Sequence, residues 1–146
     1  MDMSKTRPQR RSSRTADRKL FTLEHANSAL PLVRRVVSDV VEQYRVVVGL
    51  QQRLEELPAK GGGDARREIE EAAGEAVEKL RGLAGELDEI GVELKDWQSG
   101  LIDFPAMHEG RAVYLCWRLG EEQVSFWHEL DAGFRGRQPI DGTFSP

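Results

Sequence analysis

The sequence predicts an α+β fold, mainly helical, in which a long antiparallel helical hairpin precedes a small antiparallel β-rich C-terminal part. Two stretches of heptad-like apolar spacing, separated by a segment rich in glycine, predict two long helices that pack side by side. After Gly91 the spacing of apolar residues changes from 3.6 to 2, which is typical of strands. These observations predict one domain over residues 20–146.

The composition supports a single packed domain. The chain has 146 residues, of which 39% are hydrophobic, and with glycine included this reaches the share usual for globular proteins. No apolar run approaches the ~18–20 residues that span a bilayer, so we expect no contact with a membrane. The single cysteine, Cys116, excludes an intramolecular disulfide and favours a cytoplasmic location.

Residues 1–19 differ from the rest of the chain in charge. They contain seven lysines and arginines against two aspartates, whereas the remaining residues contain 14 basic and 23 acidic side chains. This segment has almost no large apolar residues, which predicts a disordered basic arm. Such an arm can contact nucleic-acid phosphates, but the acidic remainder favours a solubilising tail, and we do not expect a nucleic-acid partner.

The first helix is expected over residues 22–57. Thr22 is a suitable N-cap, because its hydroxyl can accept a hydrogen bond from the first turn, and Pro58 ends the helix. The apolar residues recur in alternating three- and four-residue steps, which is a strong helix signal. They are Ala26, Leu30, Val33, Val37, Val40, Tyr44, Val47 and Leu54.

The second helix is expected over residues 64–90, with Asp64 as its cap and Gly91 just after its end. Its apolar positions follow the same spacing, and several alanines indicate the close approach of another backbone. The apolar stripe is wide, and two helices alone would leave part of it uncovered. We therefore expect a homo-oligomer formed through the helices.

Residues 92–140 are expected to form a β-hairpin and loops. Short strands are predicted at 92–95 and at 101–104, where Pro105 should end the second one. Two further strands, at 112–119 and 123–130, flank a turn at 120–122. An even loop length would place Cys116 and His128 on opposite faces of the sheet. A three-residue loop would place them on the same face, and this alternative stays open.

Several motifs in order carry a resemblance to a known family. They are Phe21-Thr22 with Asn27 and Leu30-Pro31, followed by residues 100–105, 115–121, 127–129 and 133–137. Over residues 21 to about 140 the chain resembles the uncharacterised prokaryotic family catalogued as domain of unknown function 2203. The resemblance implies no activity, because none is established for that family.

The β-rich part holds most of the chemically versatile side chains. A thiolate, an imidazole and a carboxylate together suit a divalent metal such as zinc or iron. The candidate metal ligands are Asp103, Cys116, His128 and Glu129. In a strand His128 and Glu129 point to opposite faces, so a metal would need Asp103 or Cys116 as well. The alternative is a hydrogen-bond network of these residues without any metal.

Four further residues are weaker candidates. Glu121 follows a turn glycine and can cap that turn, and Asp131 shares a strand face with Glu129. Arg137 can clamp one of the carboxylates in a bidentate pair or bind an anionic ligand. His108 falls in an expected exposed turn and is the weakest of the four.

Two classes of function follow from this sequence. The first is a cytosolic oligomerising scaffold, or a protein that binds a partner or small ligand without catalysis, and the absence of a P-loop, nucleophile elbow or paired zinc-finger cysteines favours it. The second is a small metal-binding protein or metal-dependent enzyme with its site in the β-rich part. A thiol catalyst built on Cys116 and His128 is not favoured, because no oxyanion site is evident.

Overall fold

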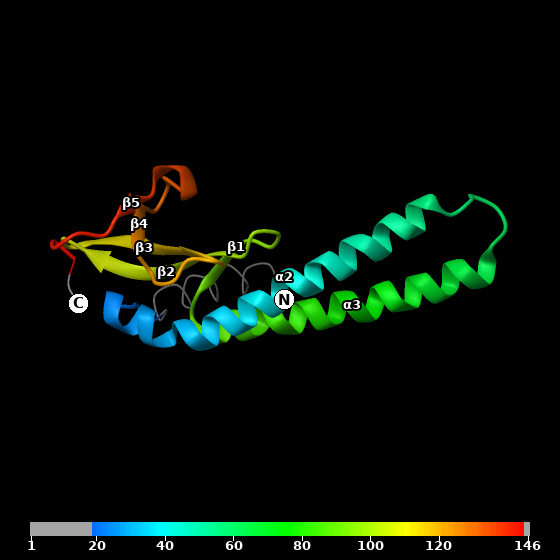
Figure 1. The fold of residues 1–146 in the computed structure, drawn as a ribbon, viewed down its shortest axis with the longest axis horizontal. Helices are drawn as coiled ribbons and strands as arrows, with labels where there is room; N and C mark the ends of the chain where they lie inside the picture. Colours follow the sequence, from blue (N-terminus) through cyan, green and yellow to red (C-terminus); the bar gives the residue numbers. More distant parts are fainter. Residues whose placement is uncertain (1–18, 145–146) are drawn as a thin grey trace, which may run out of the picture.

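The computed structural model describes residues 19–144, which form two long helices followed by a five-stranded antiparallel sheet (Figure 1). The strands lie in the sheet in the order in which they occur along the chain. The expected basic arm, apart from Lys19, lies outside the described residues. The elements are α2 (Leu23–Glu56), α3 (Gly63–Ile90), β1 (Glu93–Asp96), β2 (Leu101–His108), β3 (Arg111–Arg118), β4 (Phe126–Glu129), the 3₁₀ turn η1 (Phe134–Gly136) and β5 (Gln138–Pro139).

The helical hairpin confirms the predicted architecture and corrects one cap. The Thr22 hydroxyl accepts a hydrogen bond from the backbone amide of His25 at 3.1 Å, as an N-cap should. Asp64, however, is not the cap of α3. The helix begins one residue earlier, because Gly62 occupies the cap position in the left-handed conformation that glycine adopts without strain. The Asp64 carboxylate therefore lies in the first turn, where it faces the positive end of the helix dipole.

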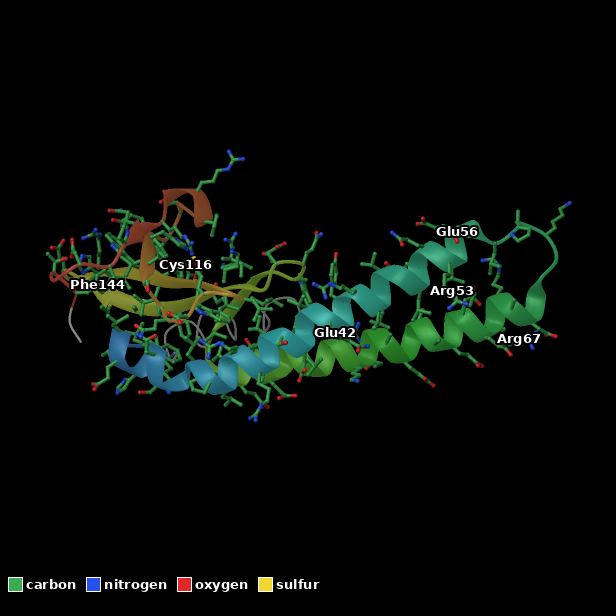
Figure 2. All side chains as sticks on the ribbon, viewed as in Figure 1. Glu42, Arg53, Glu56, Arg67, Cys116 and Phe144 are labelled. Atoms are coloured by element: carbon green, nitrogen blue, oxygen red, sulfur yellow. The ribbon has the colours of Figure 1, made fainter. Side chains whose placement is uncertain are left out.

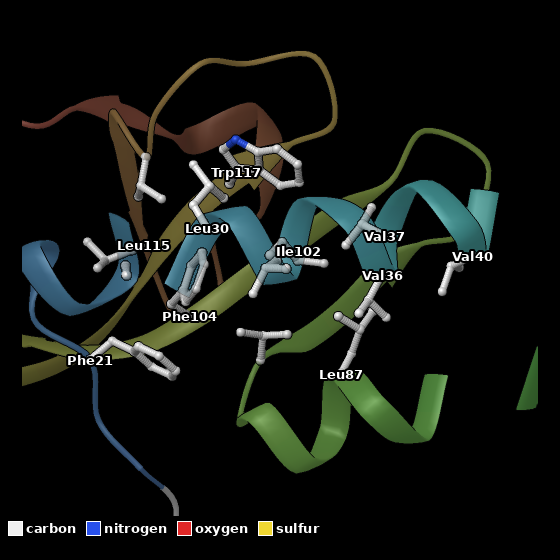
Figure 3. Close-up of a cluster of buried hydrophobic side chains, with 14 of the residues drawn as sticks. Phe21, Leu30, Val36, Val37, Val40, Leu87, Ile102, Phe104, Leu115 and Trp117 are labelled. Carbon is white, nitrogen blue, oxygen red and sulfur yellow. The ribbon is translucent and has the colours of Figure 1, made fainter. Parts of the chain in front are cut away.

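The hydrophobic core lies between α2, the sheet and the C-terminal end of α3. Figure 3 shows Val36 of α2 next to Leu87 of α3, and Ile102 and Trp117 of the sheet lie above them beside α2. Burial fades along the hairpin, since no residue from 48 to 75 is buried, and this part projects beyond the sheet (Figure 1). Neither helix in residues 19–144 is long and apolar enough to cross a membrane.

Strand β2 continues through Pro105, which corrects the expectation that this proline ends it. Pro105 pairs with Tyr114 of β3, and its carbonyl accepts a hydrogen bond from the Phe21 amide at 2.7 Å on the other edge. The amide and carbonyl of a strand residue point to the same side, so the amide that Pro105 lacks would face away from β3. The proline therefore costs no hydrogen bond between β2 and β3.

The register of β3 and β4 decides the alternative that the sequence leaves open. Cys116 pairs with Phe126 and Tyr114 with His128, so Cys116 and His128 share one face of the sheet. Strand β4 is shorter than predicted and begins only at Phe126, because the amide of Val124 binds the side chain of Asn27 in α2 instead of continuing a strand. The loop that results spans residues 119–125 and has an odd length.

Candidate metal centre

The sheet has one face against α2 and the opposite face toward the segment that contains η1 (Figure 1). Three adjacent strands place a metal-ligating side chain on this second face: Asp103 in β2, Cys116 in β3 and His128 in β4. One ligand atom of each residue lies within 4.8 Å of the other two, and all three residues are buried. The structure thus brings together three of the four candidate ligands, and Figure 2 shows Cys116 within the sheet half of the molecule.

The imidazole of His128 is held at both nitrogens. Its Nδ1 lies 2.7 Å from the backbone carbonyl oxygen of Glu129, which can only accept a hydrogen bond, so Nδ1 carries a proton and donates it. Its Nε2 lies 3.0 and 3.1 Å from the two oxygens of Asp103. A metal-bound histidine is usually oriented in this way, with one nitrogen fixed by a carbonyl and the other aimed at the ion.

Burial controls the ionisation of the other two members. Loss of water raises the pKa of the Asp103 carboxyl group, and the neighbouring His128 imidazole only partly opposes that effect. Burial, together with the Asp103 charge, raises the pKa of the Cys116 thiol to about 11. The thiol is therefore protonated at neutral pH and becomes a thiolate there only when a cation replaces its proton.

Arg137 and Glu121 extend this cluster beyond Cys116. The guanidinium and the carboxylate form a bidentate pair, with Nη1–Oε1 and Nη2–Oε2 distances of 3.3 and 2.5 Å, which is one of the two roles expected for Arg137. Arg137 Nη1 also lies 3.8 Å from the Cys116 sulfur. The guanidinium carbon lies 3.9 Å from the ring centre of Phe126 and 4.3 Å from that of Phe134. Neither phenylalanine is a candidate in the sequence, because their proximity to Arg137 depends on the fold.

Glu121 also caps its turn, as expected, since its Oε1 accepts a hydrogen bond from the Arg118 amide at 2.9 Å. Its two carboxylate oxygens are thus shared between a backbone amide and Arg137. This arrangement fixes the Arg137 guanidinium beside Cys116 and makes the pair part of the scaffold around the cluster.

Glu129 lies apart from the three clustered ligands. Its side chain is on the opposite face of the sheet, where it pairs with Arg111 at Nε–Oε1 and Nη2–Oε2 distances of 3.0 and 2.5 Å. Hydrogen bonding from Arg111 lowers the pKa of Glu129. Its contribution to the cluster comes from the backbone carbonyl that binds His128. Adjacent strand residues alternate between faces, so His128 and Glu129 cannot both point into one site.

The remaining candidates are divided between the cluster and the opposite side of the sheet. Asp131 lines a cavity that Asp103 and His128 also line. Lys95 and Tyr114 line the same cavity and are not singled out by the sequence. For Tyr114 there is one local signal in the sequence. It lies two residues before Cys116 in the same strand, so the two side chains are on the same face of the sheet. His108 is buried rather than exposed, because its ring stacks on Phe144 with the ring centres 3.9 Å apart.

A match to a known protein family spans both helices and the clustered ligands. Residues 19–140 match the family described as Uncharacterized conserved protein (DUF2203), which is most of the 146-residue chain. The chain belongs to this family. The resemblance carried by the sequence motifs is thereby confirmed, and both helices and all three clustered ligands lie within the span that DUF2203 matches. Neither the curated proteins nor the solved structures contain a match.

In this member of DUF2203 the donor set and its spacing fit a tetrahedral divalent ion. With Zn–N and Zn–O bonds of about 2.0 Å and a Zn–S bond of about 2.3 Å, tetrahedral ligand atoms lie roughly 3.3–3.5 Å apart. The Nε2 of His128 and the Asp103 oxygens are already slightly closer than this, and the largest separation in the cluster is at most 4.8 Å. An inward shift of about 1 Å would bring all three atoms to bonding distance.

Proposed function

We propose that this protein is a small metal-binding protein that holds a divalent ion, zinc or iron, between Asp103, Cys116 and His128. The observation that carries the proposal is the convergence of a carboxylate, a thiol and an imidazole from three adjacent strands, with ligand atoms within 4.8 Å of one another. Sulfur, nitrogen and oxygen donors together favour a borderline ion over calcium or magnesium.

The surroundings of the three ligands support this proposal. The carbonyl of Glu129 fixes the His128 imidazole with its Nε2 aimed at Asp103, and the Arg137 guanidinium stands beside the Cys116 sulfur. Buried ionisable groups need a compensating partner, and a divalent ion would compensate both the Asp103 carboxylate and the Cys116 thiolate. A location in the reducing cytosol belongs to this proposal, because a lone thiol stays available there as a ligand.

Elemental analysis of the protein purified without chelator tests this function directly. We expect close to one zinc or iron per chain in the natural protein and none in the His128→Ala and Cys116→Ser variants. Glu129→Gln is the matched control, because it changes a neighbouring carboxylate on the opposite face and should keep the metal. Circular dichroism should show that the compared variants are folded.

Cobalt(II) titration of the chelator-treated protein provides a second measurement. A bound thiolate gives cobalt an intense near-ultraviolet charge-transfer absorption, which Cys116→Ser should abolish. Metal-free natural protein that also gives no cobalt spectrum at micromolar concentrations would rule out the proposed function.

Self-association through the helices is a second candidate function, and a separate observation favours it. No residue between 48 and 75 is buried, and the apolar residues Leu54, Ile69 and Ala73 in this part of the hairpin are only half-buried. A second copy would cover these positions. Figure 2 shows charged side chains, Arg53, Glu56 and Arg67 among them, along the same part of the hairpin.

Sedimentation equilibrium distinguishes a single chain from an oligomer. We expect a mass that is a multiple of the 16.5 kDa chain, reduced to the single-chain mass by Leu54→Glu. Gln51→Glu is the matched control, because it adds the same charge at an exposed position of the same helix. A mass of one chain for the natural protein at high micromolar concentration would contradict this candidate.

A further inference from the structure

A cavity of about 220 Å³ adjoins the clustered ligands. Asp103 and His128 line it and are buried, whereas Lys95, Leu130 and Asp131 line it and are exposed. The cavity therefore leads from solvent to two of the three ligands. Since a cavity of about 150 Å³ holds benzene, this one has room for a molecule of about nine non-hydrogen atoms.

The ligand count leaves room for such a molecule on the ion itself. Asp103, Cys116 and His128 supply three donor atoms, whereas a tetrahedral ion takes four. Sites with three protein ligands keep the fourth position for water or a substrate, in contrast to structural sites with four protein ligands. Because Cys116 does not line the cavity and the other two ligands do, the cavity is the side from which a fourth ligand reaches the cluster.

The walls of the cavity differ in chemistry. Leu130 and Phe134 are apolar, whereas Lys95 offers an ammonium group. The Lys95 nitrogen lies 2.8 Å from a carboxylate oxygen of Glu93 and 5.2 Å from the centre of the Tyr114 ring. An ammonium has three donor hydrogens, so Lys95 can donate to a second anionic oxygen while it stays paired with Glu93.

We propose that this cavity binds a small organic carboxylate with an apolar body. Its carboxylate occupies the fourth position on the ion and lies beside the Lys95 ammonium, while its apolar part packs between Leu130 and Phe134. Asp131 stands at the exposed part of the cavity and opposes the negative charge, so it limits the affinity. This inference rests on the proposed metal site and adds the chemical class of the ligand.

Benzoate is a suitable probe, because it combines one carboxylate with a phenyl ring and has nine non-hydrogen atoms. The experiment titrates benzoate into the full-length protein loaded with cobalt(II) and follows the visible d–d absorption, which changes when the fourth ligand changes. We expect a saturable change with benzoate, and binding weaker by about tenfold for benzamide, the uncharged molecule of the same size.

Two variants of residues that line the cavity should change the affinity for benzoate in opposite directions. Lys95→Met should weaken benzoate binding about tenfold, whereas Asp131→Asn should strengthen it several-fold, because the first removes an attractive charge and the second a repulsive one. Lys60→Met, in the exposed loop between the helices, is the matched control and should leave the affinity unchanged.

The outcomes separate this inference from the proposed function. Absence of any cobalt spectrum overturns the metal site and the ligand proposal with it. A cobalt spectrum that benzoate leaves unchanged overturns the ligand proposal alone. Equal binding of benzoate and benzamide, or an unchanged affinity in Lys95→Met, overturns the assignment of a carboxylate.

Discussion

His128 and Asp103 form a buried hydrogen-bonded pair through the imidazole Nε2 and the carboxyl group. The Nδ1 of His128 carries its own proton, because the Glu129 carbonyl at 2.7 Å can only accept a hydrogen bond. The contacts of 3.0 and 3.1 Å between Nε2 and Asp103 therefore require one further proton, on either the ring or the carboxyl group. This proton lies where the proposed metal ion would bind, so the ion would take its place.

Removal of one partner of this buried pair should destabilise the metal-free protein strongly. Asp103→Ala leaves the His128 imidazole buried without its partner, and we expect the free energy of unfolding to fall by about 3–5 kcal/mol. Urea denaturation measures this loss. Glu129→Ala is the control, because its pair with Arg111 is half-exposed and such pairs are weak. A similar loss in both variants would contradict the central role of the buried pair.

The thiol of Cys116 should make the metal-free protein less stable in alkaline solution. Its pKa is raised from 9.0 to about 11 in the folded state, so between these values the folded chain holds a proton that the unfolded chain releases. Stability from this group is complete below pH 9 and is lost as the pH rises toward 11. Urea unfolding across this range should show a steeper decline for the natural protein than for Cys116→Ser. If the stability of both proteins declined equally between pH 9 and 11, the raised pKa of Cys116 would be disproved.

Gly100 should tolerate a side chain much less well than Gly110, although both have a positive φ, of 74° and 81°. A Cβ at Gly100 would lie 2.8 Å from a methyl group of Val37 and 2.9 Å from the Leu119 Cβ, whereas nothing lies within 4 Å at Gly110. We expect Gly110→Ala to cost about 1–2 kcal/mol, from backbone strain alone. Gly100→Ala should cost about 2–5 kcal/mol. Thermal unfolding compares the two, and equal costs would contradict the close contact.

The side-chain oxygen of Asn27 should contribute to the stability of the fold. Its Oδ1 accepts a hydrogen bond from the Val124 amide at 2.8 Å and so attaches the 119–125 loop to α2. Asn27→Ala leaves that amide without an acceptor and should lower the free energy of unfolding by about 1–3 kcal/mol. Asn27→Asp keeps an oxygen in place and should cost less. The hydrogen-exchange rate of the Val124 amide is a local readout, and an unchanged rate in Asn27→Ala would exclude the bond.

Arg137 and Glu121 should be energetically coupled. Both side chains are largely buried, and they meet through two parallel hydrogen bonds. A double-mutant cycle of Arg137→Ala and Glu121→Gln should give a coupling energy of about 1–3 kcal/mol in urea unfolding. Arg137→Lys should recover little of the loss, since lysine lacks the planar fork that binds Glu121 and stacks on Phe126. Arg135→Ala, an exposed neighbour, is the control, and zero coupling would contradict the pair.

The helices could be predicted closely because their signals are local. Thr22 caps α2, Pro58 follows its end, and the apolar spacing identifies the faces that pack. The one wrong cap, at Asp64, arose where the preceding glycines can take conformations that no sequence pattern distinguishes. The strand ends are harder to predict, since a strand tolerates a proline such as Pro105 only where the missing amide faces away from the neighbouring strand.

The residue types alone identify the side chains that are chemically able to form the candidate centre, and Asp103, Cys116 and His128 all come from that set. That these three meet while Glu129 lies on the other face follows from the strand pairing in the fold. A shift of one residue in the pairing of β3 and β4 would exchange the two faces, and nothing within these strands excludes it. The loop between them is anchored by helix α2, where Asn27 binds the Val124 amide and Arg34 binds the Glu122 carbonyl at 2.8 Å. The register therefore depends on contacts some 90 residues away in the chain.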